Sequence, residues 1–374
     1  MSASSNKPRW GTPPWIVDFH PAPRPVPGEV DFAVVGGGFT GLAAAAWLRR
    51  LNPQKKVALL EAESIGAGSS GRSGGVALAE TAAGDLPGLG DVLRGSSGAL
   101  RELAVDCDLA LPGAWELGRN DALPDSPISW VDSGTLRAVQ EVAGGTVDPG
   151  KLVSGLARAA DRMGALICEN ARVENVAFEE PLRLDVSGKQ LRARGVLLAT
   201  NAQSLEMSGL LGHAEPTFTL AVATEPLTPA QMEALGLASR KPFYTVDLPY
   251  LWGRLLANSG VVFGSGLVYV NGWRDLAALD VDAGEPAELI AHLERRVRGL
   301  HPVLQSVRFT HRWGGPILIG EEWIPVFRCH PRSPHALVLG AYSGHGVALS
   351  VHLGCWAAEV MLGRRRLPTW DGVH

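Results

Sequence analysis

The segment Val30–Glu61 constrains the fold of this chain more than any other stretch of its sequence. It reads VDFAVVGGGFTGLAAAAWLRRLNPQKKVALLE. Asp31–Val35 is a short apolar run of the kind that forms buried parallel strands. A glycine-rich turn and an Ala-rich helix follow, and Asn52-Pro53 ends that helix. Val57–Leu60 is typical of a second strand, so the segment predicts a βαβ unit with parallel strands.

The turn of this unit has the spacing Gly36-x-Gly38-x-x-Gly41, which binds dinucleotides when it opens such a helix. Gly36 permits the tight bend, Gly38 lets backbone N–H groups approach a pyrophosphate, and Gly41 lets the helix lie close to the sheet. Glu61 ends the second strand and can accept a hydrogen bond from a ribose hydroxyl. We therefore expect a Rossmann-like dinucleotide site. A βαβ unit with a plain glycine turn is the alternative.

Composition narrows the classes of partner. The 374 residues can hold two domains, and 46% hydrophobic with 19% charged residues is usual for a globular protein. A net charge of −4 gives no basic surface, so we expect no nucleic-acid partner. No stretch approaches the ~20 consecutive apolar residues of a membrane span, and no secretory signal opens the chain. The cysteines show no C-x-x-C pairing, so we expect free thiols and a cytoplasmic location. They are Cys107, Cys168, Cys329 and Cys355.

Other segments predict further parts of the same crevice. Ser64–Gly75 (SIGAGSSGRSGG) is polar and offers successive backbone N–H groups that suit an anion; a flexible linker is the alternative. The apolar run Gly195–Ala199 predicts a buried parallel strand, and ligands bind outside the carboxyl ends of such strands. Ala336–Leu339, a glycine turn and a helix over Val347–Leu362 repeat the first pattern. The β-branched and aromatic runs within 217–313 predict an antiparallel sheet.

Residues 1–29 are rich in proline and predict an extended arm that lies on the body of the protein. Trp10, Trp15, Ile16 and Phe19 are expected to hold it there by burying apolar surface. Cys329-His330 and His335 lie among prolines, so we interpret that region as a loop and predict no metal site.

With these segments assembled, the chain resembles the FAD-dependent amine and amino-acid oxidases of the D-amino-acid-oxidase superfamily. It looks most like the gamma-glutamylputrescine oxidase branch. The motifs that carry the resemblance are VVGGGFTGLAAA at 34–45, LLEAESIGAGSSGRSGG at 59–75, DPGKLVSGLARAADRMGA at 148–165, LLATNA at 197–202, ATEPLT at 223–228, RWGG at 312–315 and GAYSGHGVALS at 340–350.

The resemblance implies an α/β (α+β) protein of two domains and FAD as its cofactor. The FAD-binding domain, with a parallel sheet, is expected over 30–80, 146–207 and 314–374. The substrate domain, with an antiparallel sheet over the flavin, is expected over 81–145 and 208–313. The residues implied to contact FAD are Gly36, Gly38, Phe39, Thr40, Gly41, Glu61, Ala62, Ser69, Ser70, Arg72, Ser73, Gly74, Val173, Ala199, Thr200, Asn201, Gly315, Gly344, His345, Gly346 and Val347.

The expected reaction is hydride transfer from the carbon beside an amine, which gives an imine that water hydrolyses. Strand alternation places Tyr250, Trp252 and Arg254 on one face, so Trp252 and Arg254 are catalytic candidates; core packing and a structural salt bridge are the alternative. His345 is a third candidate, although the backbone of its turn is the better place to stabilise negative charge.

Departures from the family pattern sharpen these expectations. Trp313 stands about where sarcosine oxidases tether the flavin through cysteine, so we expect non-covalent FAD. Val268 and Ala348 stand about where those enzymes carry lysines, which leaves oxygen or another electron acceptor open. Residues 126–148 form a much shorter segment than the corresponding part of the putrescine-type relatives, so a flavin-binding protein with little catalysis is one alternative function. A flavin monooxygenase, which shares the first glycine motif, is another.

Overall fold

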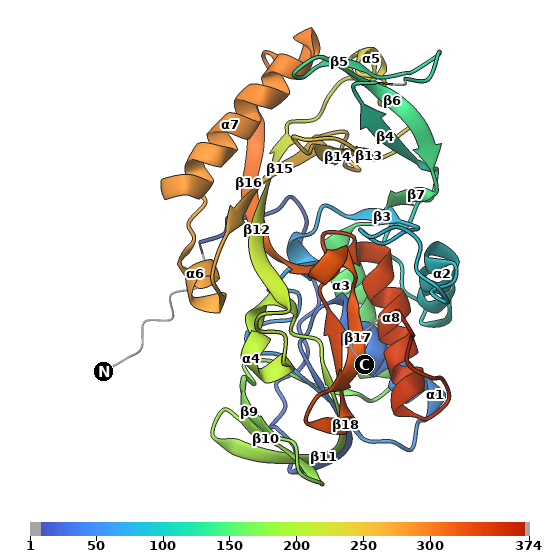
Figure 1. Ribbon diagram of the computed structural model, residues 1–374, viewed down its shortest axis with the longest axis vertical. Coiled ribbons are helices and arrows are strands. Elements are labelled where there is room, and N and C mark those ends of the chain that lie inside the picture. Colours follow the sequence, from blue (N-terminus) through green and yellow to red (C-terminus); the bar gives the residue numbers. More distant parts are fainter. Residues whose placement is uncertain (1–8, 121, 371–374) are drawn as a thin grey trace.

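The computed structural model describes residues 9–120 and 122–370 of the chain. Figure 1 shows two halves, each built around one large sheet, with β12 (Ala214–Thr224) running from one half toward the other. The fold is mixed α/β with one largely parallel and one largely antiparallel sheet, as the sequence predicts. Among the described residues, none of the helices has both the length and the apolar character that a membrane crossing requires.

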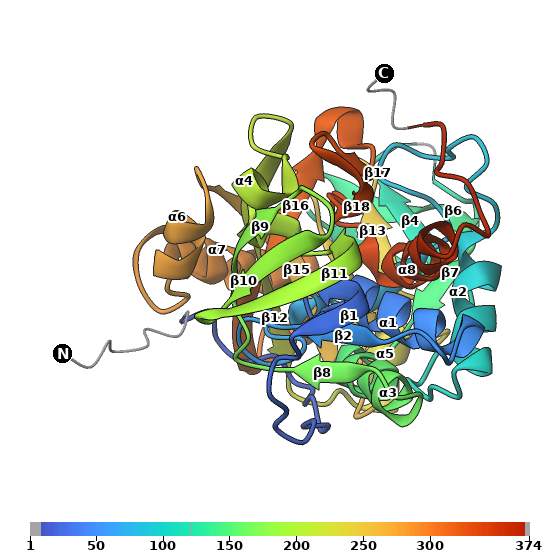
Figure 2. The ribbon, with the colours of Figure 1, turned by 90° about the horizontal axis from the view of Figure 1, so that it is seen from below.

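The first sheet has the strand order β17-β18-β11-β1-β2-β8, and a ribbon of β9 and β10 extends from β11. Parallel pairing joins β18, β11, β1, β2 and β8, so their carboxyl ends meet at one edge. Figure 2 shows β8, β2, β1 and β11 following one another across this sheet. The turns after β1, β11 and β18 therefore lie together. The bounds are β1 (Glu29–Val35), β2 (Val57–Leu60), β8 (Leu166–Cys168), β9 (Val173–Ala177), β10 (Leu182–Val186), β11 (Lys189–Leu198), β17 (Val326–His330) and β18 (Ser333–Gly340).

Both faces of the first sheet are covered, which explains why its central strands are apolar throughout. Helices α1 (Phe39–Leu51), α3 (Pro149–Arg162) and α8 (Gly346–Met361) cover one face. Val34 and Leu59 point into the core beneath these helices. Ala33 and Val35 belong to the core on the opposite face, which also contains side chains of the β9–β10 ribbon.

The second sheet has the strand order β16-β12-β15-β14-β13-β4-β6-β5 and is antiparallel except between β13 and β4. Helix α7 (Gly284–Leu300) packs along β12 and β15, with Leu293, Val297 and Leu300 buried (Figure 1). The short helices α5 (Pro229–Ala234) and α6 (Trp273–Ala278) were not predicted. The strand bounds are β4 (Ala114–Gly118), β5 (Ser129–Val131), β6 (Thr135–Val142), β13 (Phe243–Thr245), β14 (Trp252–Leu255), β15 (Val261–Tyr269) and β16 (Phe309–Gly320).

Smaller elements connect the two sheets. They are the strand pair β3 (Val76–Leu78) and β7 (Gly144–Thr146), and the helices α2 (Val92–Glu102) and α4 (Leu205–Ser208). Helix α2 begins after Asp91, which caps it by accepting from the Arg94 N–H at 2.8 Å, and it ends before Ala104, which has a φ of +51°.

The N-terminal arm lies extended on the body from residue 9, and residues 1–8 of the predicted arm lie outside the described part. Trp10 and Trp15 are buried, as predicted. Ile16 is 78% exposed, so the prediction that it anchors the arm is wrong.

The predicted loop around Cys329 and His330 is also wrong, because both residues belong to the β17–β18 hairpin. The His330 ring stacks on Phe178 with 3.9 Å between centroids. In the described part of the chain, no three His, Cys, Asp or Glu side chains are grouped to hold a metal ion.

Candidate active site

One crevice of ≈ 1010 Å³ lies between the carboxyl edge of the first sheet and the inner face of the second. This volume is at the upper end of the range of about 300–1,000 Å³ for ligand sites. Of the residues predicted to contact FAD, all except Gly41 line the crevice. The structure therefore brings together residues from six separate parts of the sequence, which are 36–40, 61–74, 173, 199–201, 315 and 344–347.

The first glycine turn fits close approach by a ligand. Gly36 has a φ of +110°, and a Cβ there would lie 2.6 Å from the Ala199 carbonyl oxygen. Gly38 precedes α1 and, having no side chain, does not cap the helix itself. Gly41 lies behind the turn, where a Cβ would meet the Gly36 oxygen at 2.0 Å. The open N-terminus of α1 thus faces the crevice and suits a pyrophosphate.

Glu61 holds this turn in place. Its Oε2 accepts from the Gly37 N–H at 2.7 Å, and its Oε1 accepts from the Glu63 N–H at 2.9 Å. Burial raises the pKa of the carboxyl group. Glu61 also lines the crevice beside Ala62, where its side chain could accept a hydrogen bond from a ribose hydroxyl.

The loop after Glu61 provides short polar side chains. Ser70 Oγ accepts from the Phe39 N–H at 2.9 Å, which fixes the loop against the start of α1. Ser69 Oγ donates to the Pro316 carbonyl at 2.6 Å and accepts from Asn201 at 3.3 Å.

Two hydroxyl groups in the crevice wall are buried without a hydrogen-bond partner among the described residues. They belong to Ser73 and Thr200. A buried hydroxyl without a hydrogen bond costs free energy, so both oxygens suit a polar ligand in the crevice. Together with the glycine cradle and Glu61, they fit the dinucleotide that the sequence predicts.

The Arg72 side chain turns away from this ligand position. Its guanidinium donates to the carbonyl oxygens of Trp10 at 3.2 Å and Gly11 at 2.9 Å, and it lies 5.4 Å from the Trp10 ring centroid. Burial lowers its pKa to about 10. Arg72 lines the crevice, but its charge holds the N-terminal arm.

A second glycine turn lies beside the first. Tyr342 and Thr40 share a hydrogen bond of 2.7 Å between their hydroxyl oxygens, which joins the turn before α8 to α1. Gly344 has a φ of +89° and no atom within 4 Å of a Cβ placed there. His345 immediately precedes α8, and its side chain makes no capping hydrogen bond. Burial lowers the pKa of its ring, so the imidazole is neutral at pH 7. Gly346 and Val347, the first residues of α8, line the crevice, so the N–H groups that a helix leaves unpaired at its start lie beside it.

The second sheet forms the opposite wall through one row of residues in register. Pairing aligns Glu116 with Tyr244, Tyr244 with Trp252, and Trp252 with Gly264 across four neighbouring strands. The Trp252 ring lies between two glycine positions, since a Cβ on Gly264 would meet it at 2.0 Å and one on Gly74 at 2.1 Å. Trp252 therefore lines the crevice, as predicted for a pocket residue.

Arg254 requires a correction, because it does not line the crevice. It shares the face of Trp252, as alternation requires, but its Nε donates to the Gly74 carbonyl and its guanidinium lies 5.6 Å from the Trp15 ring centroid. Burial lowers its pKa to about 10. The side chain is a buried support for the serine-glycine loop.

Three residues of the wall were not predicted from the sequence, and they are Glu80, Glu116 and Tyr244. The Tyr244 hydroxyl oxygen lies within hydrogen-bond distance of two carboxylate oxygens, at 2.5 Å from Glu116 Oε1 and 3.2 Å from Glu80 Oε1. Alternation within β13 would have predicted the direction of Tyr244, whereas Glu80 and Glu116 lie in a part of the sequence without clear periodicity.

Comparison with known proteins agrees with this geometry. The profile of a family described as "DAO: FAD dependent oxidoreductase" matches residues 31–360. A probable oxidoreductase OrdL of Rhizobium meliloti (strain 1021) is 26% identical over 388 residues, which cover 90% of this chain and 84% of that protein. The gamma-glutamylputrescine oxidoreductase of Escherichia coli (strain K12) is 26% identical over 382 residues, covering 89% of this chain and 84% of that protein.

Solved structures share the fold. The glycine oxidase of Geobacillus kaustophilus superposes with a TM-score of 0.72 at 18% identity, covering 93% of this chain and 98% of that one. The L-amino acid deaminase of Proteus myxofaciens gives 0.70 at 15% identity, covering 96% and 95%. The two-sheet architecture is therefore shared with these two solved structures.

Proposed function

The chain belongs to the family of FAD-dependent oxidoreductases, and from this premise we propose that it oxidises an amine or amino acid at a C–N bond. The substrate carbon beside the nitrogen loses a hydride to the cofactor and becomes an imine, which water then hydrolyses. FAD supplies the hydride acceptor when it is bound. The protein supplies orientation, a sheltered crevice and positioned dipoles.

The observation that carries this proposal is the position of two open helix N-termini on one crevice. The turns before α1 and α8 are joined by the hydrogen bond between Thr40 and Tyr342. The first turn, with Glu61, suits the pyrophosphate and ribose of a dinucleotide. The second offers backbone N–H groups that stabilise negative charge where it develops.

The remaining residues divide between binding and support. Ser73 and Thr200 have free hydroxyl groups to offer the cofactor, and Trp252 forms an apolar wall on the substrate side. His345 is neutral at pH 7 because burial lowers the pKa of its ring, which suits a limited part in proton transfer. We place the substrate-facing part of the chain in 81–145 and 208–313, although β16 crosses the boundary at 313.

The test is anaerobic reduction of the purified holoprotein. Amines and amino acids are added separately, and the bleaching of the flavin absorbance is followed. Bleaching by at least one of them supports the proposal. A protein that consumes NAD(P)H is a monooxygenase instead, and one that no amine or amino acid bleaches is a flavin-binding protein. After flavin reduction, we propose that oxygen or another electron acceptor reoxidises the enzyme. We also propose that the protein is cytoplasmic.

A further inference from the structure

The N-terminal arm lies against the serine-glycine loop, Ser69–Gly74. Every residue of this loop except Gly71 lines the crevice, whereas none of the described arm residues, 9–29, does. The exception is the residue that the arm binds, because Trp15 Nε1 donates to the Gly71 carbonyl at 2.7 Å in a buried hydrogen bond. The loop therefore lies between the arm and the crevice.

A second contact joins the arm to the loop through Arg72. The Arg72 Nη1 donates to the Gly11 carbonyl at 2.9 Å and to the Trp10 carbonyl at 3.2 Å. The backbone of Arg72 is held as well, because Trp313 Nε1 donates to its carbonyl at 3.0 Å. The Trp15 ring packs edge-on against Trp313, with 5.4 Å between the ring centroids. Two consecutive residues of the loop thus depend on the arm.

The arm is itself anchored on both halves of the molecule. Trp10 Nε1 donates to the Leu276 carbonyl of α6 at 2.9 Å, in the half that contains the second sheet. The Asp18 N–H donates to Ser154 Oγ at 2.9 Å, on α3 in the half that contains the first sheet. The stretch from one anchor to the other carries both tryptophans and forms a fixed support for the loop.

The loop needs such support because its sequence is flexible. The segment 64–75 contains five glycines, and glycine loses more conformational freedom on ordering than any other residue. When a ligand has to order such a segment, the free energy of ordering is subtracted from the free energy of binding. Contacts with the arm order the same segment without any ligand. Arm docking and ligand binding therefore favour one loop conformation, and equilibria linked in this way are coupled reciprocally.

We propose that the N-terminal arm is part of the FAD site, with Trp10 and Trp15 as positioning residues for the loop that contacts the cofactor. The tryptophans do not line the crevice and act through Gly71 and Arg72. The docked arm raises the affinity for FAD, and bound FAD stabilises the docked arm by the same factor. This inference concerns the cofactor, so it does not depend on which compound the enzyme oxidises.

The first measurement is the Kd of the apoprotein for FAD, obtained by titration from the quenching of flavin fluorescence. Trp15→Phe keeps an aromatic ring beside Trp313 but removes the N–H, so the buried Gly71 carbonyl loses its partner. We expect the Kd for FAD to rise about fivefold or more, the size of effect that a lost buried hydrogen bond has on an equilibrium. Thermal unfolding of the same apoprotein measures any general loss of stability.

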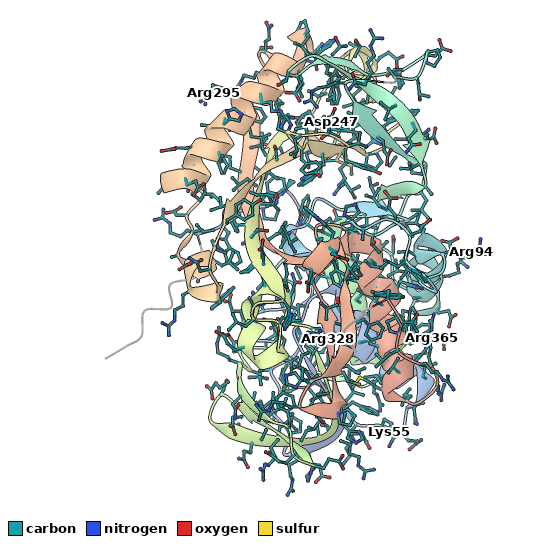
Figure 3. The ribbon with its side chains drawn as sticks, viewed as in Figure 1. Lys55, Arg94, Asp247, Arg295, Arg328 and Arg365 are labelled. Carbon is teal, nitrogen blue, oxygen red and sulfur yellow. The ribbon has the colours of Figure 1, made fainter. Side chains whose placement is uncertain are left out.

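Trp130→Phe is the matched control. Trp130 is buried, its Nε1 donates to the Leu235 carbonyl at 3.1 Å, and it does not line the crevice. It lies two residues before Asp132, which shares Arg119 with Asp247, and Figure 3 shows Asp247 in the half that contains the second sheet. This variant loses the same kind of bond away from the loop. It should lower the melting temperature and leave the Kd for FAD within about twofold of the parent value.

Gly11→Ala tests the contact with Arg72 and replaces Trp15→Phe if that variant fails to fold. Gly11 has a φ of +70°, and a Cβ there would lie 2.1 Å from the Arg312 carbonyl oxygen. Alanine must therefore displace the arm at the carbonyl that accepts from Arg72. The Kd for FAD should rise, as it does in Trp15→Phe.

Hydrogen–deuterium exchange tests the reverse effect and needs only the parent protein. Peptides that cover 9–19 should exchange more slowly in the holoprotein than in the apoprotein, because bound FAD stabilises the docked arm. Peptides that cover β5 and β6 should exchange equally in both forms, since these strands do not contact the loop.

Two results would overturn the inference. One is equal exchange of 9–19 with and without FAD. The other is a Trp15→Phe variant whose Kd for FAD matches that of Trp130→Phe, because a lower melting temperature alone would give the arm a purely structural role. Neither result changes the bleaching of the flavin by amines, so the proposed function is tested separately.

Discussion

The indole ring of Trp252 lies against the backbone of Gly74, and a Cβ placed on Gly74 would be 2.1 Å from the ring. The contact joins the second sheet to the serine-glycine loop, so substrate wall and cofactor loop meet at a residue without a side chain. Arg254 supports the same loop by donating to the Gly74 carbonyl. The geometry of the crevice therefore depends on the absence of one methyl group.

Gly74→Ala should lower FAD retention and the melting temperature, because the added methyl must displace either the loop or the indole ring. Cofactor content per chain and thermal unfolding measure both effects. Trp252→Leu in the same chain should recover part of the loss by making room. Gly98→Ala on α2 is the matched control, since a Cβ there meets nothing within 4 Å. Equal behaviour of the two alanine variants would contradict the clash.

FAD should be released from the protein by acid or heat. By the resemblance to sarcosine oxidases, Trp313 stands about where those enzymes tether the flavin through cysteine. Its Nε1 donates to the Arg72 carbonyl at 3.0 Å. After precipitation, the yellow colour should appear in the supernatant and co-migrate with free FAD. Colour that remains with the precipitate would indicate a covalent bond from another side chain.

Glu61 should make the apoprotein less stable as pH rises. Burial raises the pKa of its carboxyl group in the folded state. The folded protein then binds a proton more readily than the unfolded chain, so this contribution to stability is present at low pH and disappears as pH rises through the folded pKa. Thermal unfolding of the apoprotein between pH 4 and pH 8 measures it.

Glu61→Gln should flatten this pH dependence and weaken FAD binding by about 1–3 kcal/mol, the usual effect of a lost charged hydrogen bond. Glu174→Gln on the β9–β10 ribbon, whose carboxylate is exposed, is the control. A variant with the pH profile of the parent protein would show that Glu61 stays ionised in the fold.

His345→Ala should slow flavin reduction only modestly, because the N–H groups of the turn remain. The ring is neutral at pH 7, since burial lowers its pKa. We expect a loss below about 10⁴-fold, the upper range for one general acid–base group. Stopped-flow reduction measures this rate. A larger loss, together with a changed pH profile, would assign proton transfer to the imidazole.

Reoxidation by oxygen should be slow, and a quinone or phenazine dye should be a faster acceptor. Oxygen accepts its first electron as superoxide, an anion that a nearby cation stabilises. Val268 and Ala348 are buried and apolar, and Arg254 does not line the crevice.

Stopped-flow mixing of the reduced enzyme with several oxygen concentrations measures this rate. Arg254→Met should leave it unchanged if the variant folds. Rates equal to those of sarcosine oxidases, with their lysines near the flavin, would contradict the prediction.

The cofactor half of the crevice was predictable because each of its residues follows a strand end with a recognisable pattern. Gly36 follows β1, Thr200 follows β11 and Gly344 follows β18, and parallel strands bring these ends together. In such a site the backbone makes many of the contacts, and the spacing of the glycines in the sequence predicts the conformation of that backbone.

The substrate half was less predictable because its contacts depend on side-chain direction and on strands distant in sequence. Arg254 was expected in the crevice, yet it lies behind the serine-glycine loop, where its Nε donates to the Gly74 carbonyl. Glu116 and Tyr244 are 128 positions apart and meet only because β13 pairs with β4. Arg72 is bound by the arm, a partner that no local pattern reveals.

The N-terminal arm also sets an order for biosynthesis. The Trp10 carbonyl accepts from the Gly314 N–H at 2.9 Å, and the Trp10 ring N–H donates to the Leu276 carbonyl. The N-terminal arm, which is synthesised first, therefore bonds to residues that are synthesised much later. β18, which extends the parallel sheet beyond β11, is also made late. During translation the ribosome therefore releases most of the chain before the arm can dock, and a truncation before β16 would leave two buried tryptophans exposed to chaperones and proteases.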